Sequence, residues 1–224
     1  MTDKKNAKRY FISGAIVFVL FAILTLLIKT VDVKAVGPMG SEIGLSEINT
    51  YFRDLIGVNI SVYEITDILG YAAIAVAVYF AGFGVGQLIK RKSIKAVDRD
   101  IIVLGVFFAV VICAYVFFEI VVVNYRPIIM DGELEASYPS SHTMLSIASL
   151  GAAIHQLAKR ISNKTLRVFA ISVCSVMMAV IVIGRFISGV HWFTDIIAGV
   201  LLSVSLLLIY IGACSAFEKR KLDL

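Results

Sequence analysis

One stretch of the sequence decides the class of fold, namely Ile101-Ile-Val-Leu-Gly-Val-Phe-Phe-Ala-Val-Val-Ile-Cys-Ala-Tyr-Val-Phe-Phe118. It contains no charged residue, and a helix of about 20 predominantly apolar residues crosses the hydrocarbon core of a bilayer. Of the 224 residues in the chain, 59% are hydrophobic and 17% are charged, whereas soluble domains carry about 25% charged residues. This composition indicates an integral membrane protein. It argues against a disordered chain, a disulfide-rich secreted module and a nucleic-acid-binding protein.

Similar stretches recur along the chain, so we predict an all-α, polytopic membrane protein with six transmembrane helices in one bundle. The predicted spans are residues 10–28, 68–89, 101–123, 142–158, 168–186 and 194–217, within a single domain over residues 1–224. In the outer loop, residues 29–67, polar and apolar residues alternate after Gly37-Pro38. This pattern favours a short amphipathic helix on the membrane surface, with a plain connecting loop as the alternative.

Basic residues are distributed unevenly between the two ends of the predicted spans. Sixteen of the 21 Lys and Arg residues fall in four segments, residues 4–9, 90–99, 159–167 and 219–221. The positive-inside rule places such segments in the cytoplasm. We therefore expect both termini to be cytoplasmic in a multi-pass protein of the cell membrane. The net charge of +5 is then a consequence of topology.

Two clusters of polar residues flank the start of the predicted fourth span, on its outer side. Glu119 and Arg126 are seven residues apart before Pro127, about two helical turns, which predicts that they share one face of the third span. Pro139-Ser140-Ser141-His142 is typical of a helix N-terminus, whose free N–H groups attract phosphate. His142 can exchange a proton near neutral pH.

A third cluster joins the fifth and sixth spans and contains Gly184-Arg185 followed by His191 and Asp195. The last two residues are four apart, which on a helix places the carboxylate beside the imidazole. One ring nitrogen would then be held as N–H by Asp195, and the other would keep a free lone pair, as in an activated nucleophile. All three clusters converge on the outer side of the membrane.

The three clusters resemble the motifs of the type 2 phosphatidic acid phosphatase family of membrane lipid phosphatases. The family motifs are Lys-x6-Arg-Pro, Pro-Ser-Gly-His and Ser-Arg-x5-His-x3-Asp. Here they read Glu119-x6-Arg126-Pro127, Pro139-Ser140-Ser141-His142 and Gly184-Arg185-x5-His191-x3-Asp195. Their order and internal spacing match, so the resemblance covers residues 119–195 closely and the remaining spans by architecture.

The resemblance implies a role for each matching residue. His191 would attack phosphorus and form a phosphohistidine, with Asp195 orienting its ring. His142 would protonate the leaving lipid oxygen and then act as base for the water that clears the intermediate. The phosphate-binding residues that it implies are Arg126, Arg185, Ser140 and Ser141, with backbone N–H groups of residues 140–142. The scheme needs no metal and no cofactor.

The sequence departs from the family motifs at three positions. Ser141 replaces a glycine, Gly184 replaces a serine, and Glu119 replaces a lysine that would meet phosphate. A carboxylate near a phosphate dianion opposes binding. Glu119 would therefore pair with Arg126 or Arg185 and hold that guanidinium in place, or turn away from the site. It could also mark a protein that binds lipid phosphates without hydrolysing them.

The sequence thus predicts a lipid phosphatase whose active site faces the extracytoplasmic side and whose partners are the bilayer and a lipid phosphate. The family implies three candidate substrates, undecaprenyl diphosphate, phosphatidic acid and phosphatidylglycerol phosphate, of which we favour the first. A lipid phosphotransferase and a non-catalytic lipid-phosphate-binding protein are the alternatives. We interpret Asp131, Glu133 and Glu135 as a solvated acidic loop and His155 as a packing residue.

Overall fold

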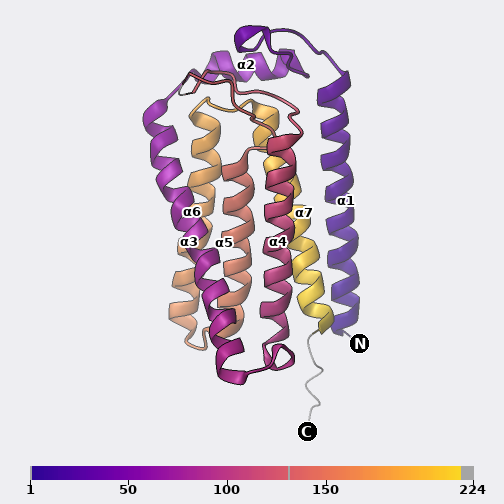
Figure 1. The fold of residues 1–224 in the computed structure, drawn as a ribbon, viewed down its shortest axis with the longest axis vertical. Coiled ribbons are helices and arrows are strands. Elements are labelled where there is room, and N and C mark those ends of the chain that lie inside the picture. The colour runs from indigo at the N-terminus through magenta and orange to yellow at the C-terminus, as the bar shows by residue number, and fades with distance from the viewer. Residues whose placement is uncertain (1, 131, 218–224) are drawn as a thin grey trace.

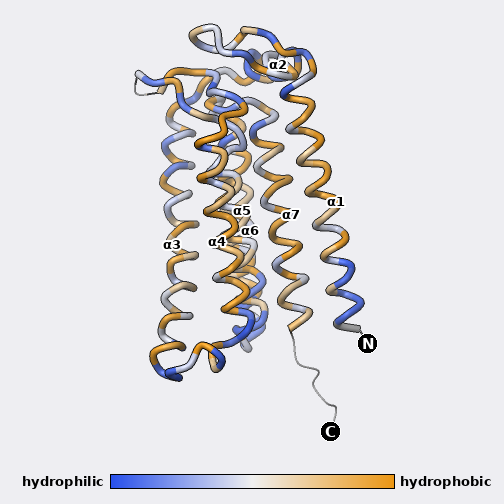
Figure 2. The backbone as a smooth tube through the Cα atoms, turned by 45° about the vertical axis from the view of Figure 1, so that its right-hand side comes forward, coloured by the Kyte–Doolittle hydropathy of each residue, from blue (hydrophilic) through white to orange (hydrophobic). Residues whose placement is uncertain are grey.

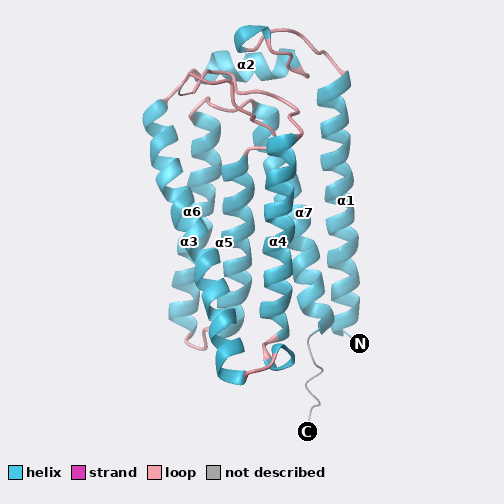
Figure 3. Ribbon diagram, viewed as in Figure 1, coloured by secondary structure: helices cyan, strands magenta, loops and turns pink. Residues whose placement is uncertain are grey.

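The computed structural model describes residues 2–130 and 132–217, and most of them form long helices that run side by side (Figure 1). Figure 3 shows loops between the helices and no strand in this part of the chain. The helices are α1 (Thr2–Thr30), α2 (Ser46–Ile56), α3 (Ile60–Arg91), α4 (Arg99–Ile120), α5 (Ser141–Arg160), α6 (Lys164–Ile187) and α7 (Phe193–Phe217), with short 3-10 turns at Pro38–Gly40 and Ile94–Ala96.

Five of these helices, α1, α3, α4, α6 and α7, are long and apolar enough to cross a membrane. Large apolar side chains such as Leu26, Ile68 and Phe169 are exposed on their outer faces. Figure 2 shows hydrophobic residues along the middle of the bundle and hydrophilic residues toward its ends. Because lipid solvates such faces and water does not, the chain is a multi-pass membrane protein.

The predicted fourth span corresponds to α5, which differs in composition from the other five. It packs against α3, α4, α6 and α7, and its polar residues Ser146, Ser149 and Gln156 are buried. Gln156 donates a hydrogen bond of 2.6 Å to the hydroxyl of Tyr210 on α7. The neighbouring helices therefore shield the polar side chains of α5 from lipid, and the sixth crossing remains a prediction.

The two ends of the bundle differ in charge and in structure. The start of α1, the α3–α4 connection and the α5–α6 connection lie at one end, whereas α2 lies across the other end (Figures 1 and 2). Three of the four predicted basic segments thus share one end, and residues 219–221 lie outside the described residues. The helix expected in the outer loop is α2.

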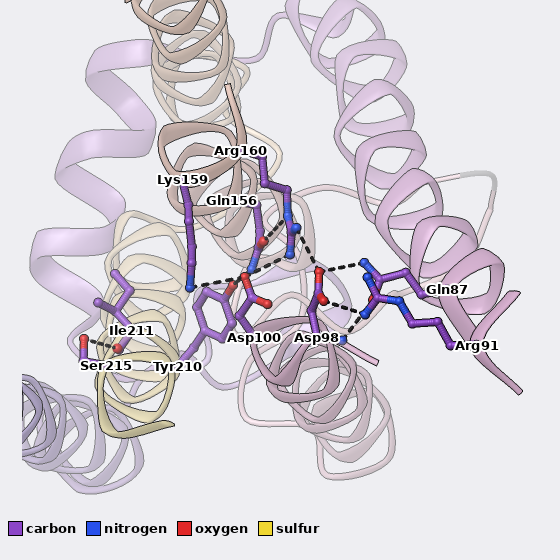
Figure 4. Close-up of polar contacts among 10 residues, drawn as sticks. All are labelled: Gln87, Arg91, Asp98, Asp100, Gln156, Lys159, Arg160, Tyr210, Ile211 and Ser215. Carbon is purple, nitrogen blue, oxygen red and sulfur yellow. Dashed lines mark hydrogen bonds and ion pairs between the residues drawn. The ribbon is translucent and has the colours of Figure 1, made fainter. Parts of the chain in front are cut away.

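At the basic end, an ion-pair network ties the α3–α4 connection to α5 (Figure 4). Asp98 accepts hydrogen bonds from Gln87 at 2.8 Å and Arg91 at 2.7 Å. Arg160 reaches Asp98 at 3.3 Å and the buried Asp100 at 2.9 Å. The hydrogen bond from Arg91 is the main cause of a lowered pKa of Asp98.

Helix ends differ from the ends of the predicted spans in several places, and α1, for example, begins at Thr2, not at residue 10. α3 begins at Ile60, not at residue 68, because the Asn59 side chain caps it by accepting a 3.1 Å hydrogen bond from the backbone of Val62. α4 ends at Ile120, not at residue 123, because the chain then turns back and pairs Tyr125 with Ala136 in an isolated bridge. The prediction that Glu119 and Arg126 share one helix face is therefore also wrong.

Candidate active site

His191 lies in the turn between α6 and α7 and is 5% exposed. Its Nδ1 is 2.9 Å from the hydroxyl oxygen of Ser137, and that hydroxyl donates a 2.5 Å hydrogen bond to Asp195 Oδ2. The predicted direct contact between His191 and Asp195 is therefore wrong, since a hydroxyl group lies between them. The reason is that α7 begins at Phe193, so His191 is not on the helix that carries Asp195.

This chain of hydrogen bonds fixes the tautomer of His191. The only hydroxyl proton of Ser137 is donated to Asp195, so Nδ1 of His191 carries the proton and donates to Ser137. The lone pair is then on Nε2, which is buried and has no hydrogen-bond partner among the described residues. Burial and the charges of Arg126 and Arg185 hold the pKa of His191 well below its ordinary value. The ring is thus neutral and has an unpaired lone pair on Nε2, which is the state that a nucleophilic histidine requires.

Asp195 is fully buried and its carboxylate is held on several sides. Besides Ser137, it accepts hydrogen bonds from the Asn124 side chain at 3.1 Å and from the backbone N–H of Trp192 at 3.0 Å. A buried carboxylate needs such donors to remain ionised. Asp195 therefore supplies a fixed negative charge, which the hydroxyl of Ser137 connects to the ring of His191.

The two arginines of the motifs converge beside His191. Arg185 is fully buried and Arg126 is 7% exposed. Arg126 Nε pairs with Glu135 at 2.9 Å, and Arg185 NH2 pairs with Asp67 at 2.7 Å. The remaining guanidinium nitrogens Arg126 NH1, Arg185 Nε and Arg185 NH1 are buried without a partner among the described residues.

Buried donors without a partner are costly, and several of them around one point indicate an anion site. The start of α5 contributes to it as the motif implies. Ser140 precedes the helix, and its hydroxyl is buried without a partner among the described residues. Its backbone N–H, however, donates to the Asp195 carbonyl at 3.0 Å. Only the N–H groups of Ser141 and His142 are left for phosphate, which corrects the implied set of three.

His142 is the second residue of α5. Its Nε2 lies 2.9 Å from Asp67 Oδ1, the same oxygen that pairs with Arg185. Its Nδ1 is buried and has no partner among the described residues. His142 and Arg185 thus lie on either side of one carboxylate oxygen, and a histidine in this place has the chemistry of a general acid or base.

Glu119 lines a small cavity together with Ser137, Ser141 and His191, and it is exposed at the end of α4. The partners of Arg126 and Arg185 are Glu135 and Asp67, so the interpretation that Glu119 holds an arginine is wrong. Glu119 lines the same cavity as His191, and the alternative that its carboxylate turns away from the site stays a prediction.

The acidic loop is not simply solvated, because one of its members, Glu135, pairs with Arg126. Asp131 lies outside the described residues. The glycine at position 184, where the family motif has serine, has a structural cause. A Cβ atom on Gly184 would collide with the side chain of Thr66 on α3, so this close approach of the two helices excludes serine.

Sequence reasoning missed five residues of this site: Tyr63, Asp67, Gly70, Asn124 and Ser137. Asp67 had a usable signal, since an ionisable residue next to an apolar run is costly unless it has a function. The predicted outer loop, residues 29–67, includes it. Ser137 directly precedes the second motif, but nothing in the motif spacing shows that it contacts His191.

The fold is thus that of a multi-pass membrane protein whose helical bundle holds a buried histidine, two arginines with unpaired donors and a helix N-terminus close together. Residues 123–217 match the model of the PAP2 superfamily. The match begins after Glu119, the residue that departs most from the family motifs.

The fold is similar to that in the crystal structure of a transmembrane PAP2 type phosphatidylglycerolphosphate phosphatase from Bacillus subtilis, with a TM-score of 0.61. The alignment covers 89% of this chain and 93% of the other, at 19% sequence identity. A search of curated protein sequences found no match. At this identity the likeness is one of fold.

Proposed function

We propose that the protein is a membrane lipid phosphatase that hydrolyses a phosphomonoester or diphosphate of a lipid through a phosphohistidine on His191. One observation carries this proposal. The Nε2 lone pair of His191 is buried without a partner among the described residues, beside similarly unpaired nitrogens of Arg126 and Arg185. A phosphoryl group between them would accept hydrogen bonds from the guanidinium groups and would place its phosphorus atom next to Nε2 of His191.

The first chemical step transfers the phosphoryl group to the enzyme. Nε2 of His191 forms a bond to phosphorus while the bond from phosphorus to the lipid oxygen breaks, and His142 gives that oxygen a proton. Arg126 and Arg185 stabilise the charge on the transferring oxygens. The positive charge that develops on His191 is offset by Asp195 through the hydroxyl of Ser137.

The second step releases phosphate. Water attacks phosphorus, His142 takes a proton from that water, and the bond from phosphorus to Nε2 of His191 breaks. Inorganic phosphate leaves and both histidines return to their starting states. No step in this scheme uses a metal ion or cofactor.

We further propose that the site opens on the extracytoplasmic side. It lies at the end of the bundle that carries α2, opposite the basic segments, and the positive-inside rule assigns the basic end to the cytoplasm. Undecaprenyl diphosphate remains our first candidate substrate, because the carrier would be dephosphorylated on that side. Phosphatidylglycerol phosphate is supported by the name of the Bacillus subtilis protein with the similar fold, and phosphatidic acid is the third candidate.

Phosphate release from these three lipids in detergent tests the proposal. His191→Ala should reduce release to background and abolish acid-labile labelling of the protein by a radioactive lipid phosphate. His155→Ala removes the third histidine, which contacts Tyr210 away from the site, and should keep most of the activity. Undiminished release by His191→Ala contradicts the proposal, and phosphate found only on a second lipid would instead identify a phosphotransferase.

A further inference from the structure

One face of α3 forms a wall of the site that none of the three motifs contains. Thr66, Gly70 and Ala73 on this face are buried, and Tyr63 and Asp67 lie on the same side one turn apart. The whole of α3 precedes residues 123–217, so the wall lies outside the segment that matches the superfamily. The match to that segment therefore does not imply the contacts of this wall with the motif residues.

Asp67 is the charged residue of this wall. A single carboxylate oxygen, Oδ1, lies 2.9 Å from Nε2 of His142 and 2.7 Å from NH2 of Arg185. The two partners come from different helices, α5 and α6. Asp67 therefore joins the proposed general acid to a proposed phosphate-binding guanidinium.

This contact determines how the ring of His142 is used. An ionised carboxylate only accepts hydrogen bonds, so Nε2 of His142 is the protonated nitrogen that donates to Asp67. Nδ1 is then the nitrogen that exchanges a proton with substrate, and it is buried without a partner among the described residues.

Two neighbours restrict both partners further. A Cβ atom on Gly70 would lie 2.6 Å from Cδ2 of His142, so the glycine lets the imidazole pack directly against the α3 backbone. The guanidinium of Arg185 lies over the ring of Tyr63, 4.5 Å from its centroid. Side chains with so little freedom are preorganised, which is what positioning for catalysis requires.

We propose that Asp67 is a positioning residue that fixes His142 as a general acid acting through Nδ1 and holds Arg185 for the phosphoryl group. This inference rests on the proposed function and adds to it a positioning residue, Asp67, and the proton-donating atom, Nδ1 of His142. It predicts that loss of the Asp67 carboxylate impairs protonation of the leaving group more than it impairs attack by His191.

Leaving-group dependence provides the test. Octyl phosphate has a poor leaving group that needs a proton from His142, whereas a nitrophenyl phosphate with an octyl chain has a good one that does not. The rate of phosphoenzyme formation is measured in single turnover for both substrates, so that the later water step does not contribute. The variants are Asp67→Asn, His142→Ala and both together, with Glu64→Gln as a control that removes an exposed carboxylate from the same turn of α3.

We expect Asp67→Asn to slow the octyl phosphate reaction by roughly 10²-fold, since general acid catalysis typically contributes 10²–10⁴-fold. The nitrophenyl reaction should slow by no more than about a tenth of that factor, and it also shows that the variant is folded. His142→Ala should give the same pattern, and the double variant should be slower than His142→Ala by no more than the small factor that Asp67→Asn costs on the nitrophenyl substrate, which reflects Arg185. Glu64→Gln should match the parent.

Equal slowing of both substrates by Asp67→Asn would make its role structural and overturn the inference. Faster reaction would also overturn it, because Asp67 would then be a competitor of phosphate for Arg185. Both results leave the proposed function intact if His191→Ala is inactive in the same assay. Activity of His191→Ala would instead remove the proposed function itself.

Discussion

Ser137 Oγ lies 2.9 Å from Nδ1 of His191, and its proton is donated onward to a buried carboxylate. The hydroxyl thereby selects the tautomer of the nucleophile and passes on the stabilising effect of Asp195. Ser137→Ala should lower kcat by roughly 10²-fold, the loss typical of one preorganised donor. Ser215→Ala, which removes a hydroxyl that only contacts its own helix backbone at Ile211, is the control. Unchanged kcat in Ser137→Ala would show that His191 does not need the hydroxyl between it and Asp195.

The pH dependence of phosphoenzyme formation should reflect the state of His191. Burial and two guanidinium groups hold its pKa well below the ordinary value of 6.5. The reactive form is neutral, so it is fully populated at pH 6.5 and is lost only as the pH falls through the lowered pKa. The acidic limb of the rate profile should therefore lie below pH 6.5, after correction for substrate ionisation by phosphorus NMR.

Arg185→Ala provides the matching comparison. Removing that positive charge should raise the pKa of His191 and move the acidic limb to higher pH, together with a higher KM. Arg91→Ala, at the last residue of α3 beside the α3–α4 connection, should leave the limb in place. A parent profile that already falls away above pH 6.5 would contradict the neutral state of His191.

Gly70 allows close packing of α3 on His142, and a methyl group there would be 2.6 Å from the ring. Gly70→Ala should displace the imidazole and lower the rate on alkyl phosphates by about 10-fold or more, as misplacement of a catalytic group does. The same helix offers matched controls, because a Cβ atom at Gly82 or Gly86 meets no atom within 4 Å. Equal activity in Gly70→Ala and Gly82→Ala would show that the close contact is not needed.

Glu119 occupies the place of a family lysine and shares a small cavity with His191. Its negative charge opposes a phosphate dianion, so Glu119→Gln should lower KM and Glu119→Lys should lower it further. Both changes should be smaller at high salt, because the residue is exposed. An identical KM in all three proteins would show that this carboxylate does not act on bound phosphate.

Stability should depend on the network at the basic end (Figure 4). Arg160→Met would remove the nearer cation of the buried Asp100, at 2.9 Å, and leave Lys159 at 3.6 Å. We expect a loss of about 1–2 kcal/mol, below the range for leaving a buried charge without any partner, visible as a lower unfolding temperature in detergent. Activity below that temperature should be retained, because the network lies at the opposite end from His191. Lys164→Met, an exposed basic residue at the start of α6, should have little effect.

The class of fold could be predicted from the sequence because a helix needs a minimum number of consecutive apolar residues to cross a bilayer. The three motifs also identified His191, His142 and the two arginines, which the structure brings together. Contacts between segments distant in the sequence could not be predicted in this way. Ser137 contacts His191 across 54 positions of the sequence, and Asp67 contacts His142 across 75. No short-range periodicity in the sequence predicts such contacts.

Helix ends were the other source of error. The carboxylates of Glu64 and Asp67 looked like loop residues because they interrupt an apolar run. In the structure Asp67 is inside α3 and its charge is neutralised by partners from other helices. The predicted third span, residues 101–123, includes Glu119 and the valines that follow, whereas α4 ends at Ile120 and the chain continues into the bridge of Tyr125 and Ala136.

The polar composition of α5 has a consequence for how the protein is made. A helix that carries Ser, His and Gln side chains on its inner face partitions poorly into lipid by itself. Its favourable surroundings exist only after α3, α4, α6 and α7 surround it. As the predicted sixth crossing, this segment should enter the bilayer stably only together with its downstream neighbours, so truncation before α6 is expected to leave it outside.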